Sequence, residues 1–142
     1  RVISGLLLIL SGVLLVNAVI QPEPPVIDWV YYRDQSIEEL QEKNRPVLIE
    51  FYADWCVACK RLDRKTFRDQ RIVEKSREFV MVRVDCTSPD NKRTPLAKKF
   101  KVVGLPTVVL ISPTGKELRA LRAVGFLGPV EMLKKMEGAT AQ

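Results

Sequence analysis

A pair of cysteines directly after an apolar run is the feature that most constrains how this chain can fold. Pro46 precedes the run Val47–Tyr52, which is short, flanked by residues that break regular structure, and typical of a central strand. The sequence Ala53-Asp-Trp-Cys-Val-Ala-Cys-Lys60 follows at once. A helix that begins at Cys56 carries Cys59 one turn further along. We therefore predict a strand–helix unit with two neighbouring thiols where the helix starts.

The position of these thiols indicates redox chemistry. Unpaired backbone N–H groups and the helix dipole favour the thiolate form of Cys56, which is the candidate nucleophile. Cys59 lies one turn further in, close enough to close a disulfide, and is the candidate resolving thiol. A Cys-x-x-Cys pair is also compatible with metal binding, and two buried structural thiols are a further alternative. The preceding strand and the lack of further ligands favour the redox interpretation.

Composition narrows the chemistry further. The chain has no histidine, which excludes a histidine general base, a Cys-His catalytic pair and histidine metal sites. The three cysteines Cys56, Cys59 and Cys86 are too few for a four-thiolate zinc site or a disulfide-stapled scaffold. We expect no metal and no cofactor other than the redox-active disulfide. A Cu(I) site formed by the two motif thiolates is the less favoured alternative, since no His or Met lies near the motif.

The net charge of +6 comes from 23 Lys and Arg against 17 Asp and Glu, spread over several candidate helices. Solvated helix faces account for such a distribution, and attraction to an anionic membrane or an acidic partner is the alternative. No aromatic residues are interleaved with the basic ones as a stacking surface requires, so we expect no nucleic-acid binding.

The N-terminal part reads as a membrane anchor. Val2–Ile20 carries no charged residue and spans about 28 Å as a helix, close to the hydrocarbon thickness of a bilayer. We predict a transmembrane helix over residues 1–20, with residues 2–20 in contact with the lipid bilayer. A cleavable signal peptide is the alternative, but Val16-Asn17-Ala18 matches the small-residue cleavage rule poorly. The chain begins with Arg1 rather than Met, and we expect it to be part of a longer protein.

Three further parts follow the predicted anchor: a Pro-rich linker over 21–26, a single α/β domain over 27–138, and a tail over 139–142. Ser36 is the predicted N-cap of an early helix, and Gly128-Pro129 begins a last helix with Val130, Leu133 and Met136 on one face. The order of elements predicts a mixed central sheet with helices on both faces. Strands are expected over 27–32, 47–52, 79–84, 102–111 and 117–123, and further helices over 56–67, 70–77 and 95–100.

Two motifs resemble the thioredoxin superfamily: Trp55-Cys-Val-Ala-Cys59 after Phe-Tyr-Ala-Asp, and Gly104-Leu-Pro-Thr107. The spacer Val57-Ala58 stands where ordinary thioredoxins have Gly-Pro, and it is typical of the C-terminal periplasmic domain of the DsbD family of membrane thiol:disulfide interchange proteins. The similarity covers roughly Ile27–Glu137. It implies a thioredoxin-like fold.

The resemblance also implies roles for single residues. Pro106 is expected in the cis form facing the dithiol, so that the backbone polar groups of Leu105 point at an incoming partner. Glu50 takes the place of a buried carboxylate beneath the dithiol, where burial raises its pKa and allows proton exchange with Cys59. A position at a strand edge is the alternative for Glu50, and the family more often has Asp at this place.

Further positions carry weaker expectations. Asp63 matches an acidic position that tunes the dithiol, although an exposed helical carboxylate near Lys60 and Arg64 is the alternative. Trp55 and Tyr52 are expected to shape the rim and the floor of the site, and aromatic packing alone is the alternative. Cys86 falls where relatives carry an apolar residue, and we expect it to pack as a small hydrophobe rather than form a regulatory or intermolecular disulfide.

By resemblance, the chain is a protein-disulfide reductase that relays electrons. The donor is a membrane-embedded domain with a cysteine pair, expected in the same polypeptide, whose last membrane helix is residues 1–20. The acceptor is an extracytoplasmic thioredoxin-like domain or protein. The implied location is the bacterial inner membrane with the soluble domain in the periplasm, and the implied processes are disulfide isomerisation and cytochrome c maturation. A stand-alone membrane-tethered thioredoxin-like reductase is the alternative.

Overall fold

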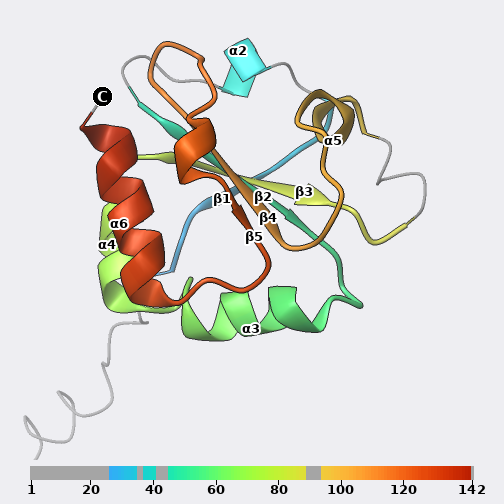
Figure 1. The fold of residues 1–142 in the computed structure, drawn as a ribbon, viewed down its shortest axis with the longest axis horizontal. Coiled ribbons are helices and arrows are strands. Elements are labelled where there is room, and N and C mark those ends of the chain that lie inside the picture. The colour runs from blue at the N-terminus through green and yellow to red at the C-terminus, as the bar shows by residue number, and fades with distance from the viewer. Residues whose placement is uncertain (1–25, 35–36, 41–44, 89–93, 142) are drawn as a thin grey trace, which may run out of the picture.

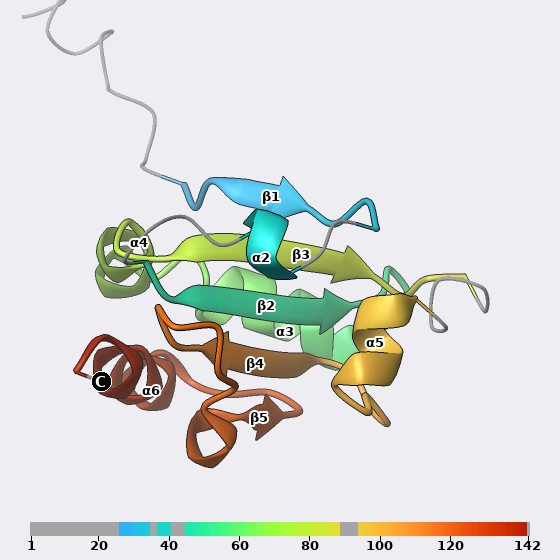
Figure 2. The same cartoon turned by 90° about the horizontal axis from the view of Figure 1, so that it is seen from above.

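A five-stranded mixed sheet organises the fold. The computed structural model describes residues 26–34, 37–40, 45–88 and 94–141. The strands β1 (Trp29–Tyr31), β2 (Val47–Tyr52), β3 (Val80–Asp85), β4 (Thr107–Ile111) and β5 (Ala123–Val124) lie in the order β1-β3-β2-β4-β5. β1 and β2 run parallel to β3, whereas β4 runs antiparallel to β2 and to β5 (Figure 2).

The predicted membrane helix lies outside the described residues, as does the predicted cap Ser36. Within the described part of the chain, no helix is both long enough and apolar enough to cross a bilayer.

Helices cover both faces of the sheet (Figures 1 and 2). One face carries α3 (Val57–Lys65), α4 (Gln70–Ser76) and α6 (Pro129–Thr140), and the other carries α2 (Ile37–Leu40) and α5 (Pro95–Lys99). This confirms the predicted layering.

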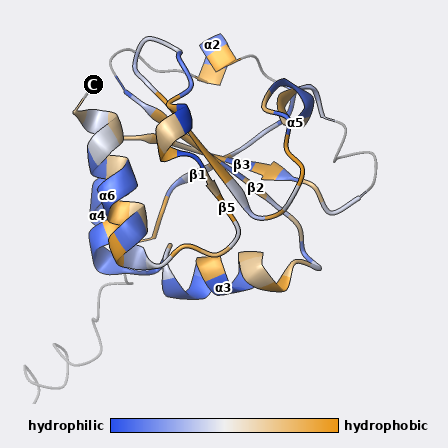
Figure 3. Cartoon of the chain, in the orientation of Figure 1, coloured by the Kyte–Doolittle hydropathy of each residue, from blue (hydrophilic) through white to orange (hydrophobic). Residues whose placement is uncertain are grey.

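Alternation along the strands produces two apolar cores. Leu48 packs toward α3 and α6, while Ile49 packs toward α2 and α5, because successive side chains of a strand point to opposite faces. β2 is buried on both faces, since it lies between two neighbouring strands and between two helical layers, and its residues other than Glu50 are apolar or aromatic. Figure 3 shows hydrophobic colour along the strands and hydrophilic colour over much of α3 and α6.

The predicted strand over 102–111 is shorter than expected. β4 begins only at Thr107, and the preceding residues form a loop that ends in a cis peptide bond between Leu105 and Pro106. Proline has no N–H to donate to the ladder, so pairing starts after Pro106.

The predicted strand over 117–123 is wrong for most of its length. Glu117 makes a single bridge to Ile111, after which the chain forms the 3-10 helix η2 (Arg119–Leu121) and then the two-residue β5. Leu118 and Leu121 both pack into the core beside α6. A spacing of three residues suits one helical turn rather than a strand.

The apolar face of α6 also differs from the prediction. Met132, Met136 and Ala139 are buried, Leu133 is half-buried, and Val130 is 53% exposed. The spacing of four and three residues between the buried positions defines the stripe that meets the core.

This stripe yields a test of stability with a matched control. Met132→Ala removes a side chain with 0% exposure and leaves a cavity, so the free energy of unfolding should fall by about 2–5 kcal/mol. Val130→Ala should change the same quantity by less than about 0.5 kcal/mol, because Val130 faces solvent. Urea unfolding followed by circular dichroism measures both. Equal effects of the two substitutions would contradict the observed orientation of α6.

Candidate active site

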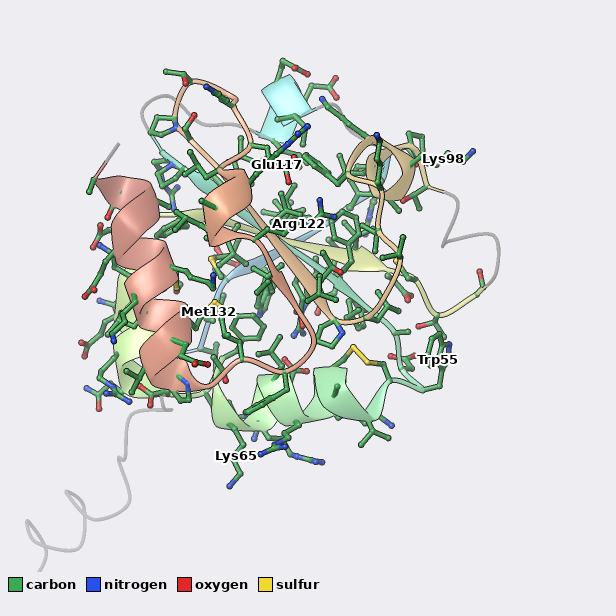
Figure 4. The ribbon with its side chains drawn as sticks, viewed as in Figure 1. Trp55, Lys65, Lys98, Glu117, Arg122 and Met132 are labelled. Carbon is green, nitrogen blue, oxygen red and sulfur yellow. A yellow bond between two sulfur atoms is a disulfide. The ribbon has the colours of Figure 1, made fainter. Side chains whose placement is uncertain are left out.

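The two cysteines lie where β2 ends and α3 begins. Cys56 is the N-cap of α3 with an extended backbone, and its Sγ accepts a hydrogen bond from the backbone N–H of Cys59 at 3.1 Å. Both residues are buried, and a disulfide joins them with 5.2 Å between their Cα atoms. Figure 4 shows the sulfur–sulfur bond at the start of α3, with Trp55 beside it. The predicted placement of the thiols at a helix N-terminus is confirmed.

Two hydrogen bonds to Thr87 hold the loop that precedes the disulfide. The indole Nε1–H of Trp55 donates to the carbonyl oxygen of Thr87 at 2.9 Å, and the backbone N–H of Asp54 donates to Thr87 Oγ1 at 3.0 Å. Trp55 is thereby fixed half-exposed beside the dithiol, while Tyr52 packs against the buried Cys56 and Cys59.

The cis-proline loop closes the site from β4. Leu105 packs against the cluster of Ala53, Cys56 and Cys59, and the next peptide bond, to Pro106, is cis as predicted. The carbonyl oxygen of Pro106 accepts a hydrogen bond from Gly125 N–H at 2.8 Å, which ties this loop to β5.

A cavity of about 170 Å³ separates Trp55 from the cis-proline loop. Cys86 contributes to its wall, yet Cys86 is only 1% exposed and belongs to the core on the α5 side of the sheet. Cys86 forms no disulfide with a described residue. The prediction that it packs as a small hydrophobe is confirmed.

Glu50 is a buried acid in the middle of the sheet. Its side chain is fully buried, so the alternative position at a strand edge is wrong. It lies two residues before Tyr52, on the face of the sheet that carries α3. Burial raises the pKa of Glu50 to about 7, against the opposing effect of Arg83. One carboxylate oxygen, Oε2, accepts a hydrogen bond from Arg83 Nε at 2.7 Å. The other, Oε1, has no hydrogen-bond partner among the described residues.

Arg83 is the site residue that our sequence interpretation missed. Its guanidinium binds Glu50 and also donates through Nη2 to Asp63 Oδ1. Burial alone would lower the pKa of Arg83, but the carboxylates of Glu50 and Asp63 outweigh burial and raise it above its usual range. The side chain of Asp63 is 45% exposed on α3, and it pairs with Arg83 of strand β3.

One signal in the sequence could have pointed to Arg83. The run Val80-Met-Val-Arg-Val84 places a single charge inside a strand that is otherwise apolar. A charge buried in a central strand requires a counter-charge, and Glu50 in the next strand of the sheet supplies it.

A disulfide at a helix N-terminus, opposite a cis-proline and on a mixed sheet of this order, defines the thioredoxin-like class of proteins. The chain belongs to the thioredoxin-like family, whose family model matches residues 28–113.

Within that class, the sequence matches the thiol:disulfide interchange protein DsbD. This chain is 43% identical over 102 residues to DsbD of Actinobacillus pleuropneumoniae. The aligned region covers 68% of this chain and 18% of the relative. It is 34% identical over 110 residues to DsbD of Campylobacter jejuni. That aligned region covers 78% of this chain and 19% of the relative. The chain therefore spans about a fifth of the length of these relatives.

Solved structures bear out the fold. The oxidised C-terminal domain of Neisseria meningitidis DsbD superposes with a TM-score of 0.60 at 23% identity and covers 75% of this chain and 88% of its own. A DsbH oxidoreductase superposes with a TM-score of 0.65 at 22% identity and covers 85% of this chain and 90% of its own.

The buried acid predicts an unusual pH dependence of stability. The pKa of Glu50 is raised in the folded chain from its ordinary 4.5 to about 7. The folded state therefore binds the proton of the Glu50 carboxyl group more tightly than the unfolded state does. The stability that this protonation contributes is lost as pH rises through about 7. Relative to Glu50→Gln, the free energy of unfolding should fall by on the order of 3 kcal/mol between pH 4.5 and pH 8. Urea unfolding of both proteins across this range measures it, and parallel curves would contradict it.

Proposed function

We propose that this chain is a protein-disulfide reductase that passes two electrons through Cys56 and Cys59. The observation that carries the proposal is the disulfide at the N-terminus of α3, with the cis-Pro106 loop packed against it and the buried Glu50 on the same face of the sheet as α3. No group of three or more candidate metal ligands occurs among the described residues, and dithiol exchange needs none.

Reduction of the domain begins when a thiolate of the donor attacks Cys56 Sγ. The bond between Cys56 and Cys59 breaks, and Cys59 leaves as a thiolate that takes a proton from the carboxyl group of Glu50. The second donor thiolate then attacks the donor sulfur of the mixed disulfide. Cys56 is released as a thiolate, which the N-terminus of α3 stabilises, and the donor keeps the new disulfide.

Oxidation of the domain reverses these roles. The Cys56 thiolate attacks the disulfide of the acceptor, and one acceptor sulfur leaves as a thiolate. Cys59 then gives its proton to Glu50 and attacks Cys56 Sγ, which restores the disulfide and releases the second acceptor thiol. A carboxyl group with a pKa near 7 can serve both half-reactions, because both of its protonation states are populated near neutral pH.

The surface around the dithiol suits a protein partner. Val57, next to Cys56 in the chain, and Val103 are exposed large apolar residues, Val103 at 94%, and Val103 lines the cavity between Trp55 and Leu105. An extended partner segment that presents its cysteine to Cys56 could place a neighbouring apolar side chain there, with its backbone against Leu105.

The cellular role extends the resemblance to DsbD. In this proposal residues 1–20 are a transmembrane helix in the bacterial inner membrane, and residues 27–138 form the domain that faces the periplasm. The donor is a membrane-embedded cysteine pair of the same polypeptide, and the acceptor is an extracytoplasmic thioredoxin-like protein that serves disulfide isomerisation and cytochrome c maturation. The matched relatives, named as thiol:disulfide interchange proteins, support this assignment. Six or more hydrophobic segments upstream of Arg1 would favour it over a stand-alone tethered reductase.

The reduction potential of the Cys56–Cys59 pair tests the direction of electron flow. Thiol trapping in glutathione and dithiothreitol buffers, with Cys86→Ala to remove the third thiol, measures it directly. A reductase should give a value near the roughly −270 mV of thioredoxin. A value near the roughly −120 mV of a strong oxidant would instead make the domain a disulfide donor.

Single cysteine variants test the assigned roles. Cys59→Ser should accumulate a mixed disulfide between Cys56 and an added disulfide substrate, because no resolving thiol remains. Cys56→Ser is the matched control and should accumulate little, since Cys56, and not Cys59, is the N-cap of α3, where the helix N-terminus stabilises a thiolate. Mass spectrometry of the trapped species separates the two. Equal trapping by both variants would contradict Cys56 as the nucleophile.

A further inference from the structure

The outward side of α3 concentrates positive charge. Cys59 and Leu62 form the buried side of this helix. The spacing of the basic residues places them on the opposite side, and Figure 4 shows Lys65 pointing away from the sheet. We call this surface the basic face, and its exposed members are Lys60, Arg61, Arg64, Lys65 and, just after the helix, Arg68.

No carboxylate of α3 neutralises the basic face. Asp63 is the one acid of this helix, and it binds a residue of β3 instead. None of the basic-face cations forms an ion pair with a described residue, and Arg61 lies over the ring of Phe126 at 4.1 Å. On the neighbouring helix α4, by contrast, Arg71 binds Asp69 of its own N-cap. The charge of the basic face is therefore available to a partner outside the domain.

The described chain begins beside the same helix. Val26 and Ile27 line a cavity of about 450 Å³ together with Phe67 and Arg68, which follow the C-terminal end of α3. Only residues 21–25 separate Val26 from the predicted membrane helix, and they span at most about 18 Å when fully extended. An anchor at residues 1–20 would thus hold the basic face close to the lipid surface.

We propose that the basic face of α3 binds the anionic headgroups of the membrane to which the chain is anchored. This inference rests on one part of the proposed function, the transmembrane helix at residues 1–20. Lys and Arg side chains are attracted to an anionic lipid surface within roughly a Debye length, about 8 Å at physiological salt. An acidic protein is the other partner that such a face could bind. The position of Val26 beside the end of α3 favours the membrane.

This contact orients the dithiol. Cys56 is the N-cap of α3, and the next residue, Val57, is 78% exposed. Val57 lies three residues before Lys60 and four before Arg61, so it shares their side of the helix. α3 is only about 14 Å long, and when its basic face rests on the headgroups both of its ends lie near the bilayer. The disulfide then lies at the level of the membrane surface, where a membrane-embedded donor can reach it.

The opposite face of the sheet supplies an internal control. Lys98 and Lys99 on α5 are also exposed lysines, and α5 covers the face of the sheet away from α3. Figure 4 shows Lys98 and Lys65 on opposite sides of the domain. A membrane that binds the basic face should therefore leave the lysines of α5 in water.

Amine labelling of the full chain tests the orientation. The chain is reconstituted into phosphatidylcholine vesicles with or without about one-third phosphatidylglycerol, and lysines are acetylated with an uncharged N-hydroxysuccinimide ester. Mass spectrometry gives the labelling rate of each lysine. On anionic vesicles the rates of Lys60 and Lys65 should fall about threefold or more, while those of Lys98 and Lys99 should stay unchanged. About 0.5 M NaCl should restore the rates of Lys60 and Lys65, because salt screens the attraction.

Charge reversal provides a second measurement. The double variant Arg64→Glu with Arg68→Glu should return the labelling rate of Lys60 on anionic vesicles to its value on neutral ones. The matched double variant on α5, Lys98→Glu with Lys99→Glu, should leave Lys60 protected. Circular dichroism checks that both variants fold. Should either variant fail to fold, the labelling of the unaltered chain still decides.

Equal labelling of Lys60 and Lys65 on the two kinds of vesicle overturns the inference and leaves the basic face to an acidic protein. A fall shared equally with Lys98 and Lys99 also overturns it, since that indicates adsorption without orientation. Flotation with neutral vesicles in about 0.5 M NaCl tests the anchor separately. If the chain does not float there, the predicted transmembrane helix fails, while labelling on anionic vesicles still decides the role of the basic face.

Discussion

The rest of the site depends on a carboxyl group held in the dry interior of the sheet. A charge buried without a partner costs far more than the hydrogen bonds of one strand can recover, so the fold must supply a counter-charge. β3 supplies it with Arg83, directly beside Glu50 in the sheet register. α3 supplies Asp63, which binds the other side of the same guanidinium. The three residues thus connect two strands and the helix that carries the dithiol.

The parts of this site that could be predicted from the sequence are local ones. β2 is apolar apart from Glu50, and the two cysteines follow it within a few residues, so the strand, the helix start and the N-cap all lie within one short segment. The cis form of Pro106 followed from resemblance to a family motif and not from local physics. Burial of Glu50 was an expectation of the same kind, and its surroundings in the sheet bear it out.

The parts that could not be predicted depend on contacts between distant segments. Arg83 lies 33 residues from Glu50 and 20 from Asp63 in the chain, and neither spacing suggests a pairing. Contacts between distant segments also explain why residues 119–121 form η2 rather than a strand, and why α6 buries a different side from the one predicted. Leu118, Leu121 and Met132 reach one shared core, and the shape of that core decides which side of each element is buried. The hydrophobic pattern alone predicted that Val130 is on the buried face of α6, whereas Met132 is buried there and Val130 is exposed.

Stability and chemistry make opposite demands on Glu50. Above neutral pH the ionised Glu50 carboxylate makes the folded state less stable than the protonated acid does below it, because burial disfavours the charge. A dithiol that is alternately reduced and oxidised nevertheless needs a group that can both give and take a proton at the pH where it works. Burial moves Glu50 toward that pH from its ordinary range, and Arg83 limits how far burial can move it. The balance between these two effects, rather than either residue alone, sets the protonation of this buried acid.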